Sequence, residues 1–426
     1  MFKNYFSKSY IVGHYIIRWI LITVPVAVAI GSMVALFLWL LNWAIHYRFA
    51  HTWLLYLLPL AGVVIHFLYK LYGRSAERGN NLIIDEIYEP GAGVPRRMAP
   101  LILITTVITH LFGGSAGREG TAVQIGGSIA NMLGTWFKLQ PQDKRVVLTA
   151  GIAAGFGAVF GTPLAGAVFA MEVLVIGRIQ YTALLPCLVG GLIGDATVAA
   201  WGVQHTHYHI GNISVGQSIY GHYLTVDFWL LLKVVLASVC FGIAAYAFAV
   251  TAHGVKNLAN RFVKTPWLIP VYGGCIIVAL TFILGKPDYL SLGVDPEYPG
   301  AVTIVSAFQQ GGAHFFSWFW KLIYTCITLG TGFKGGEVTP LFYIGATLGN
   351  TLAGLLNAPV SLFAALGFIA VFAGATNTPL ACTLMGIELF GSEHALLFAV
   401  ACFIAYYCSG DTGIYSAQRK GEAKGG

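Results

Sequence analysis

The residue types best suited to chemistry lie in residues 117–121, which have the sequence GREGT. They place a carboxylate, Glu119, and a guanidinium, Arg118, between glycines inside an otherwise apolar run. A charged side chain at the centre of a bilayer costs about 2.5–3.5 kcal/mol on insertion scales, so such a residue indicates a functional site. The glycines let backbone N–H groups approach a ligand, and the following apolar run indicates a helix that begins here. The alternative for Glu119 is a buried structural ion pair.

The composition of the chain predicts which kind of secondary structure holds this segment in place. Of 426 residues, 57% are hydrophobic and 10% are charged, against about 25% charged in soluble domains. Mean hydropathy is +0.74. This composition predicts an all-α polytopic membrane protein in contact with a lipid bilayer. Long apolar segments recur at residues 19–44, 53–68, 98–111, 228–250 and 267–284.

Several other kinds of site are not supported by the sequence. The seven cysteines lie in apolar segments without CxxC spacing, which favours small packed side chains over ligands or disulfides. His205, His207 and His209 alternate, but no Cys or carboxylate completes a metal set, so we interpret them as a polar loop. No HExxH motif and no paired aspartates occur in apolar segments. We therefore expect no enzyme activity, no cofactor or metal, and no nucleic-acid partner.

The distribution of basic residues predicts the topology. Both termini are basic, with Lys3 and Lys8 at one end and Arg419 and Lys420 at the other, whereas residues 179–232 contain no Lys or Arg. The positive-inside rule then puts both termini in the cytoplasm and residues 206–225 outside the inner (plasma) membrane. Each half must cross an odd number of times. We expect one transport domain, 1–426, made of a first repeat (1–205), the connecting loop (206–225) and an inverted second repeat (226–426).

Two sequence blocks repeat between the halves. Thr-Pro-Leu-Ala at 162–165 precedes Glu172, and the same four residues at 378–381 precede Glu388, an offset of 216. A second block of Gly, Ile, Gly and Asn repeats at an offset of 219, from Gly117 to Gly336. Inverted repeats place broken helices at the membrane midplane, where their N-terminal N–H groups suit an anion. The recurrence of Glu172 and Glu388 favours a structural role for both at a helix end.

Four segments resemble the CLC family of anion channels and anion/proton antiporters. Residues 117–121 resemble its GREGP segment, which carries a gating glutamate, and residues 335–340 (GGEVTP) stand at its GxFxP segment. Residues 79–83 (GNNLI) stand at GSGIP, and residues 415–417 (YSA) match the segment with the anion-binding tyrosine. The resemblance covers nearly the whole chain. It implies a CLC-like inverted repeat and a homodimer with one pathway per subunit, and we expect no CBS or other soluble domain.

The departures from the family pattern point to one branch. GREGP has become GREGT, Asn80 replaces the serine of GSGIP, and Glu172-Val173 replaces the Glu-Glu pair whose second member handles the inner proton. With Glu337 and Thr339 in the second-half motif, this combination resembles the fluoride/proton antiporter branch. The resemblance implies fluoride and protons as the transported ions. The alternative is a chloride/proton exchanger or a passive anion channel.

The resemblance also implies a role for each candidate residue. An ionised Glu119 imitates the anion in its site, and a protonated Glu119 leaves it, so one carboxylate couples the two ions. Glu337 could replace the missing inner proton acceptor, and Thr339 could hold it or offer a hydroxyl to the anion. We assign Arg118 to the anion entrance or a structural pair, because neighbours in sequence do not face each other on a helix. The remaining anion ligands are expected to be Asn80, Tyr415 and the amides of Gly120, Glu337 and Val338.

Structural alternatives exist for these residues as well. Asn80 could cap a helix that begins near Leu82. Tyr415 could belong to an interfacial aromatic belt. Glu337 could simply stabilise a helix N-terminus. Thr121 and Thr339 are expected to satisfy backbone groups more than to touch substrate, with Thr339 the better candidate for substrate contact.

Overall fold

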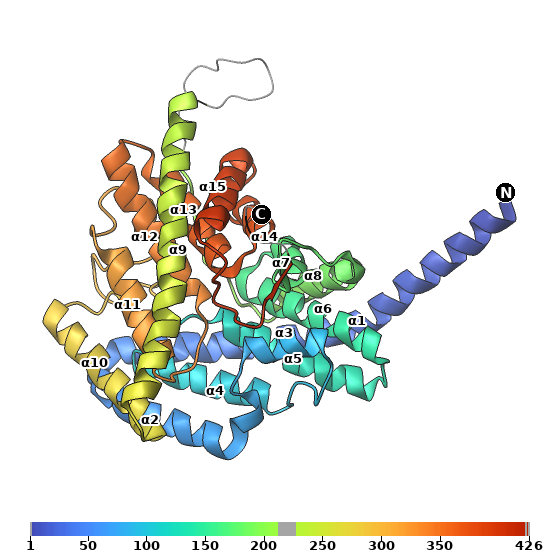
Figure 1. Cartoon of the computed structure of the whole chain (residues 1–426), viewed down its shortest axis with the longest axis horizontal. Helices are drawn as coiled ribbons and strands as arrows, with labels where there is room; N and C mark the ends of the chain where they lie inside the picture. Colours follow the sequence, from blue (N-terminus) through green and yellow to red (C-terminus); the bar gives the residue numbers. More distant parts are fainter. Residues whose placement is uncertain (1, 212–226, 422–423, 425–426) are drawn as a thin grey trace.

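The fold is a bundle of α-helices, and the chain includes two that are much longer than the rest (Figure 1). This computed structural model describes residues 2–211, 227–421 and 424. The described residues form these helices: α1 (Phe2–Ala50), α2 (Leu58–Leu68), α3 (Asn80–Tyr88), α4 (Met98–Leu111), α5 (Glu119–Trp136), α6 (Pro141–Phe160), α7 (Pro163–Glu172), α8 (Leu184–Ala200), α9 (Phe228–Phe262), α10 (Ile269–Leu284), α11 (Ser317–Gly330), α12 (Val338–Leu356), α13 (Val360–Thr376), α14 (Pro379–Phe390) and α15 (Ala395–Cys408).

The outer helices have the length and surface of membrane spans. Five described segments are long and apolar enough to cross a bilayer, among them most of α1 and all of α9. Large apolar side chains face outward, for example Phe282 and Ile283 on α10, which are 81% and 75% exposed. A soluble surface rarely tolerates so much exposed apolar area, whereas lipid contact requires it. The predicted polytopic membrane architecture is confirmed.

The helix boundaries reproduce the repeats found in the sequence. Helices α5 and α12 begin at Glu119 and Val338, 219 positions apart, and α7 and α14 begin at Pro163 and Pro379, 216 positions apart. Helices α4–α8 therefore correspond to α11–α15. Proline at the first helical position explains the shared start of α7 and α14, because its missing N–H would have no partner there anyway.

The repeated glycines are points where helices cross. A Cβ atom at Gly126 of α5 would lie 2.2 Å from the carbonyl oxygen of Gly151 in α6. A Cβ atom at Gly345 of α12 would lie 2.0 Å from the carbonyl oxygen of Gly367 in α13. Both distances are far inside van der Waals contact, so only glycine allows the two backbones to touch here. These contacts aim the N-termini of α5 and α12 at the middle of the bundle.

Each half supplies a carboxylate to a helix of the other half. Glu388, near the end of α14, accepts hydrogen bonds from the N–H groups of Leu164 (2.9 Å) and Ala165 (2.8 Å) at the start of α7. Glu172, the last residue of α7, accepts from Leu380 (3.1 Å) and Ala381 (2.8 Å) at the start of α14. We call this arrangement the reciprocal cap. It agrees with the structural role expected for both glutamates.

Replacing Glu172 with Gln should lower the stability of the folded chain. Glu172 is 7% exposed, and the amide would present an NH₂ donor to one of the two N–H groups that it now accepts from. Losing one charge-assisted bond and leaving a donor unpaired costs about 1–3 kcal/mol. Thermal unfolding in detergent measures the effect. Glu393→Gln, on the exposed turn after α14, is the control and should unfold like the native chain.

Candidate anion and proton site

The N-termini of α5 and α12 meet through their glycines. Gly117 and Gly336 form an antiparallel bridge in which each N–H donates to the carbonyl of the other, at 2.6 and 2.8 Å. A Cβ atom at Gly336 would lie 2.6 Å from the amide nitrogen of Gly120. Since a larger residue could not fit, the two loops can touch only because both positions are glycine. The predicted meeting of broken helices is confirmed.

The carboxylate of Glu119 occupies the point where both helices aim their N–H groups. It is 1% exposed. One oxygen, Oε2, accepts from the amides of Arg118 (3.1 Å) and Thr339 (3.0 Å), and the Thr339 hydroxyl donates to the other oxygen, Oε1. Donors from both halves of the chain thus surround one negative group. Such converging amides at helix N-termini suit any small anion of similar size.

The two threonines differ in what they bind. Thr339 was expected to satisfy backbone groups, and this prediction is wrong, because its hydroxyl donates to Glu119. The Thr121 hydroxyl instead lies 2.8 Å from that of Thr106. That Thr339 is the better candidate of the two for substrate contact stays a prediction. Its bond to Glu119 joins residues 220 positions apart, which a local pattern does not reveal.

Arg118 faces Glu119, contrary to the expectation from helix geometry. Its Nε lies 3.5 Å from Oε1 of Glu119. The expectation failed because Arg118 is the N-cap of α5 and stands outside the helix, where the spacing rule for helix faces does not apply. Arg118 also lines a wider cavity with Gln204, His205 and Asp295. Both predicted roles, entrance and ion pair, are therefore compatible with its position.

The segment after α8 covers Glu119, which sequence analysis missed. His205, Thr206 and Tyr208 line a small pocket together with Arg118 and Glu119. The segment belongs to the region interpreted as a polar loop, and its histidine alternation gave no sign of this contact. Residues 212–225 of the predicted connecting loop lie outside the described residues.

We call a second set of candidates the inner group: Asn80, Glu337 and Tyr415. Two of its members, Asn80 and Glu337, lie beside the first turn of α5. A Cβ atom at Gly120 would lie 3.2 Å from Nδ2 of Asn80 and 3.8 Å from Oε2 of Glu337. Glu337 is the N-cap of α12, but its side chain makes no capping hydrogen bond. Gly120 and Val338, in the first turns of α5 and α12, are buried close to Glu337.

Asn80 does not cap a helix, so the capping interpretation is wrong. Helix α3 begins at Asn80 itself, and Gly79 is the N-cap, with φ of 56°, a conformation that favours glycine. Asn80 is 9% exposed, and its Oδ1 has no hydrogen-bond partner in the described part of the chain. A buried, unpaired amide oxygen is uncommon. The side chain is thus available to a ligand, although its role stays a prediction.

Tyr415 is buried (7% exposed) and does not belong to an interfacial belt. The C-terminal segment is held inside the bundle by hydrogen bonds from Ile414 N–H to the Ala375 carbonyl and from Ala417 N–H to Asn81 Oδ1, both 2.9 Å. A short parallel pairing of β1 (Val175–Ile176) with β2 (Arg419–Lys420) holds it further along. Asn81 follows Asn80 in α3, so these bonds place the segment that contains Tyr415 beside the start of that helix.

Sequence comparison identifies the class of protein that has this fold and site. Residues 61–410 match the family model described as voltage gated chloride channel. The match covers most of the chain, and the chain therefore belongs to the CLC family.

Individual relatives are consistent with this assignment. A chloride/fluoride channel protein of Pseudomonas syringae pv. tomato is 48% identical over 96% of this chain and 88% of its own length. An H⁺/Cl⁻ exchange transporter of Vibrio cholerae is 25% identical over 72% of this chain and 68% of its own length. The crystal structure of a CLC-type fluoride/proton antiporter superimposes with a TM-score of 0.86 at 33% identity, covering 95% of this chain and 98% of that one.

Replacing Thr339 with Val tests its hydroxyl at nearly constant side-chain volume. A hydrogen bond to a charged group contributes about 1.5–3 kcal/mol, so the Glu119 carboxylate should leave its position more easily. An anion in the same place would also lose a donor. We expect a higher half-saturating anion concentration and a proton-independent leak, measured in liposomes. Thr121→Val removes a hydroxyl that bonds Thr106 instead, and it should leave both quantities near native values.

Proposed function

We propose that this chain is a fluoride/proton antiporter that exports fluoride from the cytoplasm in exchange for protons, and that it is not an enzyme. The observation that carries the proposal is the Glu119 carboxylate, held by the amides of Arg118 and Thr339 from opposite halves of the chain. A negative group bound by converging helix N-termini stands where a transported anion would stand.

Exchange follows from competition for these donors. An ionised Glu119 accepts three hydrogen bonds and closes the site. A proton on the carboxyl removes the charge that the helix N-termini attract, so the side chain can leave and an anion can take its place. When the anion departs, the carboxylate returns by losing its proton. Each anion that passes therefore requires a change in the protonation of Glu119.

Small donors in and near the site support fluoride as the anion. Fluoride is a small, strongly hydrated acceptor that must recover hydrogen bonds when it is dehydrated. The Thr339 hydroxyl and amide supply two donors, and the inner group adds the Asn80 amide and the Tyr415 phenol. In this proposal Glu337 carries the inner proton, Arg118 lines the entrance, and the amides of Gly120 and Val338 complete the ligand set.

A second candidate is a chloride/proton exchanger or a passive anion channel, because the relative at 48% identity is named a chloride/fluoride channel protein. Liposomes that contain the purified chain distinguish the candidates when fluoride, chloride and proton fluxes are recorded together. Fluoride efflux that drives proton uptake against a pH gradient, with little chloride movement, supports the antiporter. Equal chloride and fluoride flux would overturn fluoride selectivity, and flux without proton movement would indicate a channel.

The proposal includes an assembly and an orientation. We propose a homodimer in the inner (plasma) membrane in which each subunit has its own pathway. Both termini face the cytoplasm, residues 1–205 and 226–426 form the inverted repeats, and residues 206–225 connect them outside. The exposed apolar side chains of α1, α9 and α10 support contact with lipid. Cysteine labelling in sealed vesicles at either terminus tests the orientation.

A further inference from the structure

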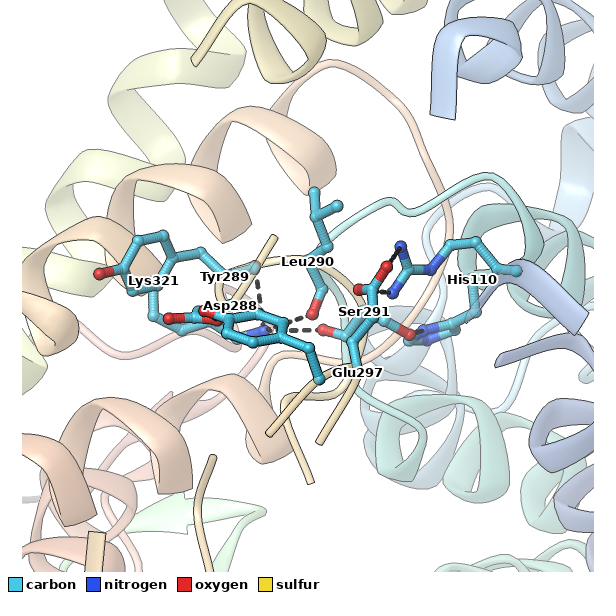
Figure 2. Close-up of polar contacts among 9 residues, drawn as sticks. His110, Asp288, Tyr289, Leu290, Ser291, Glu297 and Lys321 are labelled. Atoms are coloured by element: carbon cyan, nitrogen blue, oxygen red, sulfur yellow. Dashed lines mark hydrogen bonds and ion pairs between the residues drawn. The ribbon is translucent and has the colours of Figure 1, made fainter. Parts of the chain in front are cut away.

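A lysine is buried in the apolar interior of the described structure without a carboxylate partner. Lys321, in the second turn of α11, is 0% exposed and makes no ion pair with any described residue. Its Nζ donates to the carbonyls of Ser291 (2.7 Å), Tyr289 (3.2 Å) and Leu290 (3.4 Å) (Figure 2). These three acceptors match the three N–H donors of a lysine side chain. Burying such a group is costly unless all its donors are used, so the segment 289–291 is shaped around it.

Ser291 joins this lysine to the first half of the chain. Its φ of 51° lies in the left-handed region, which residues other than glycine rarely adopt. With its carbonyl bonded to Lys321, its hydroxyl lies 2.9 Å from Nδ1 of His110, the penultimate residue of α4. Figure 2 shows Ser291 between these two residues. The strained backbone is thus held by a hydrogen bond on each side.

His110 reaches the loop that precedes Glu119. The imidazole is 0% exposed, and its Nε2 has no hydrogen-bond partner among the described residues. The His110 carbonyl accepts a hydrogen bond from the Gly113 N–H (3.1 Å), in the loop that leads to Gly117. Gly117 forms the bridge to Gly336 and immediately precedes Arg118, whose amide binds Glu119. The hydrogen bonds from Lys321 through Ser291 to His110 therefore lead to the loop that carries the Arg118 amide.

The same lysine contacts the donor helix of the second half. Its Nζ lies 5.2 Å from the ring centroid of Tyr343, one turn after Thr339 in α12. The Tyr343 hydroxyl donates to the Val302 carbonyl at 3.3 Å. The loop between α10 and α11, which contains the carbonyls of Ser291 and Val302, is also tied to α1 by two hydrogen bonds between Arg48 and Glu297, at 2.6 and 3.2 Å. Lys321 is thus connected to the segments that carry both groups of donors around Glu119, the Arg118 amide and the Thr339 amide and hydroxyl.

We propose that Lys321, Ser291 and His110 form a positioning network that sets the spacing between the Arg118 and Thr339 amides and thereby the affinity of the anion site. This inference builds on the anion site of the proposed function. A small, dehydrated anion is sensitive to donor spacing, because hydrogen bonds weaken steeply outside a narrow distance range. None of the three residues needs to touch the anion.

The decisive variant is Ser291→Gly. Glycine adopts the positive φ without strain and keeps the carbonyl for Lys321, so the variant should fold and lose only the bond to His110. We expect the half-saturating fluoride concentration to rise about 3- to 10-fold, as for the loss of one neutral hydrogen bond. We also expect fewer protons to move per fluoride. His110→Ala should give the same change, and the double variant should add little, because both substitutions cut one connection.

Lys321→Met removes all three hydrogen bonds to the carbonyls of residues 289–291 and is the larger perturbation. Its control is Lys286→Met, in the loop between α10 and α11, because the Lys286 side chain is exposed. Native affinity and proton stoichiometry in both Ser291→Gly and His110→Ala would overturn the network. Additive effects in the double variant would overturn it as well. If the unaltered chain moves chloride with protons in place of fluoride, the proposed function fails. The same variants measured with chloride still decide the network separately.

Discussion

Replacing Glu119 with Gln is expected to abolish proton movement driven by fluoride while anions still pass. Glutamine keeps the shape of the side chain but cannot bind and release a proton near neutral pH. It is also uncharged, so the converging helix N-termini hold it less strongly than an anion. Groups that transfer protons typically contribute about 10²–10⁴-fold to rate, so fluoride-driven proton uptake should fall at least about 100-fold. A pH electrode and a fluoride electrode in the same liposome suspension record both fluxes.

Glu89→Gln is the matched control, because Glu89 is exposed and pairs with Arg419 at the surface. It should exchange ions like the native chain. Unchanged coupling in Glu119→Gln would remove this residue from the mechanism, even though three donors surround its carboxylate. Loss of both fluxes in a folded protein would contradict the competition and would favour a role for Glu119 in holding the two helix ends together.

The second large effect is expected for Glu337→Gln. Glu337 is the N-cap of α12 and makes no capping bond with its side chain, so the substitution should preserve the start of the helix. Its carboxyl lies beside Gly120 together with the Asn80 amide, next to the first turn of the helix that carries Glu119. If it relays the inner proton, proton flux should fall at least about 10-fold while Glu119 can still release the anion.

The ratio of protons to fluoride separates the possible outcomes for Glu337. A lower ratio with retained fluoride flux supports a proton relay. A native ratio with full transport would refute that role and leave Glu337 as a charge near a helix N-terminus. Asn80→Leu is a useful companion variant, since it removes the neighbouring amide without a titratable group. It should weaken fluoride binding and leave the ratio intact.

The elements that could be predicted from the sequence are those whose spacing is imposed by backbone contact. The repeats at offsets of 216 and 219 were visible because helix crossings at Gly126 and Gly345 require glycine, and because α7 and α14 both begin with proline. Glu119 stood out because a carboxylate in an apolar run is costly. The family motifs then brought the inner group into the prediction.

The predictions that were wrong or missing depended on contacts between distant segments or on a single backbone angle. Arg118 was placed on a helix face, although it stands one residue before the helix. Helix α3 begins two residues earlier than expected, because Gly79 can adopt a positive φ. The cover formed by Thr206 and Tyr208 has no local pattern. Lys321 did carry a signal, since it is a lone charge within an apolar segment, the same argument that identified Glu119.

The reciprocal cap makes the order of synthesis important for this chain. Helix α7 is made long before Glu388, which accepts its N–H groups and lies 223 and 224 positions beyond Ala165 and Leu164. At about 5–20 residues per second, the ribosome needs roughly 10–45 s to reach it. During that interval the start of α7 lacks its acceptors in surroundings where unpaired N–H groups are costly. The first half should therefore remain incompletely packed in the membrane until the end of the second half arrives, and two separately expressed halves should become stable only after they associate.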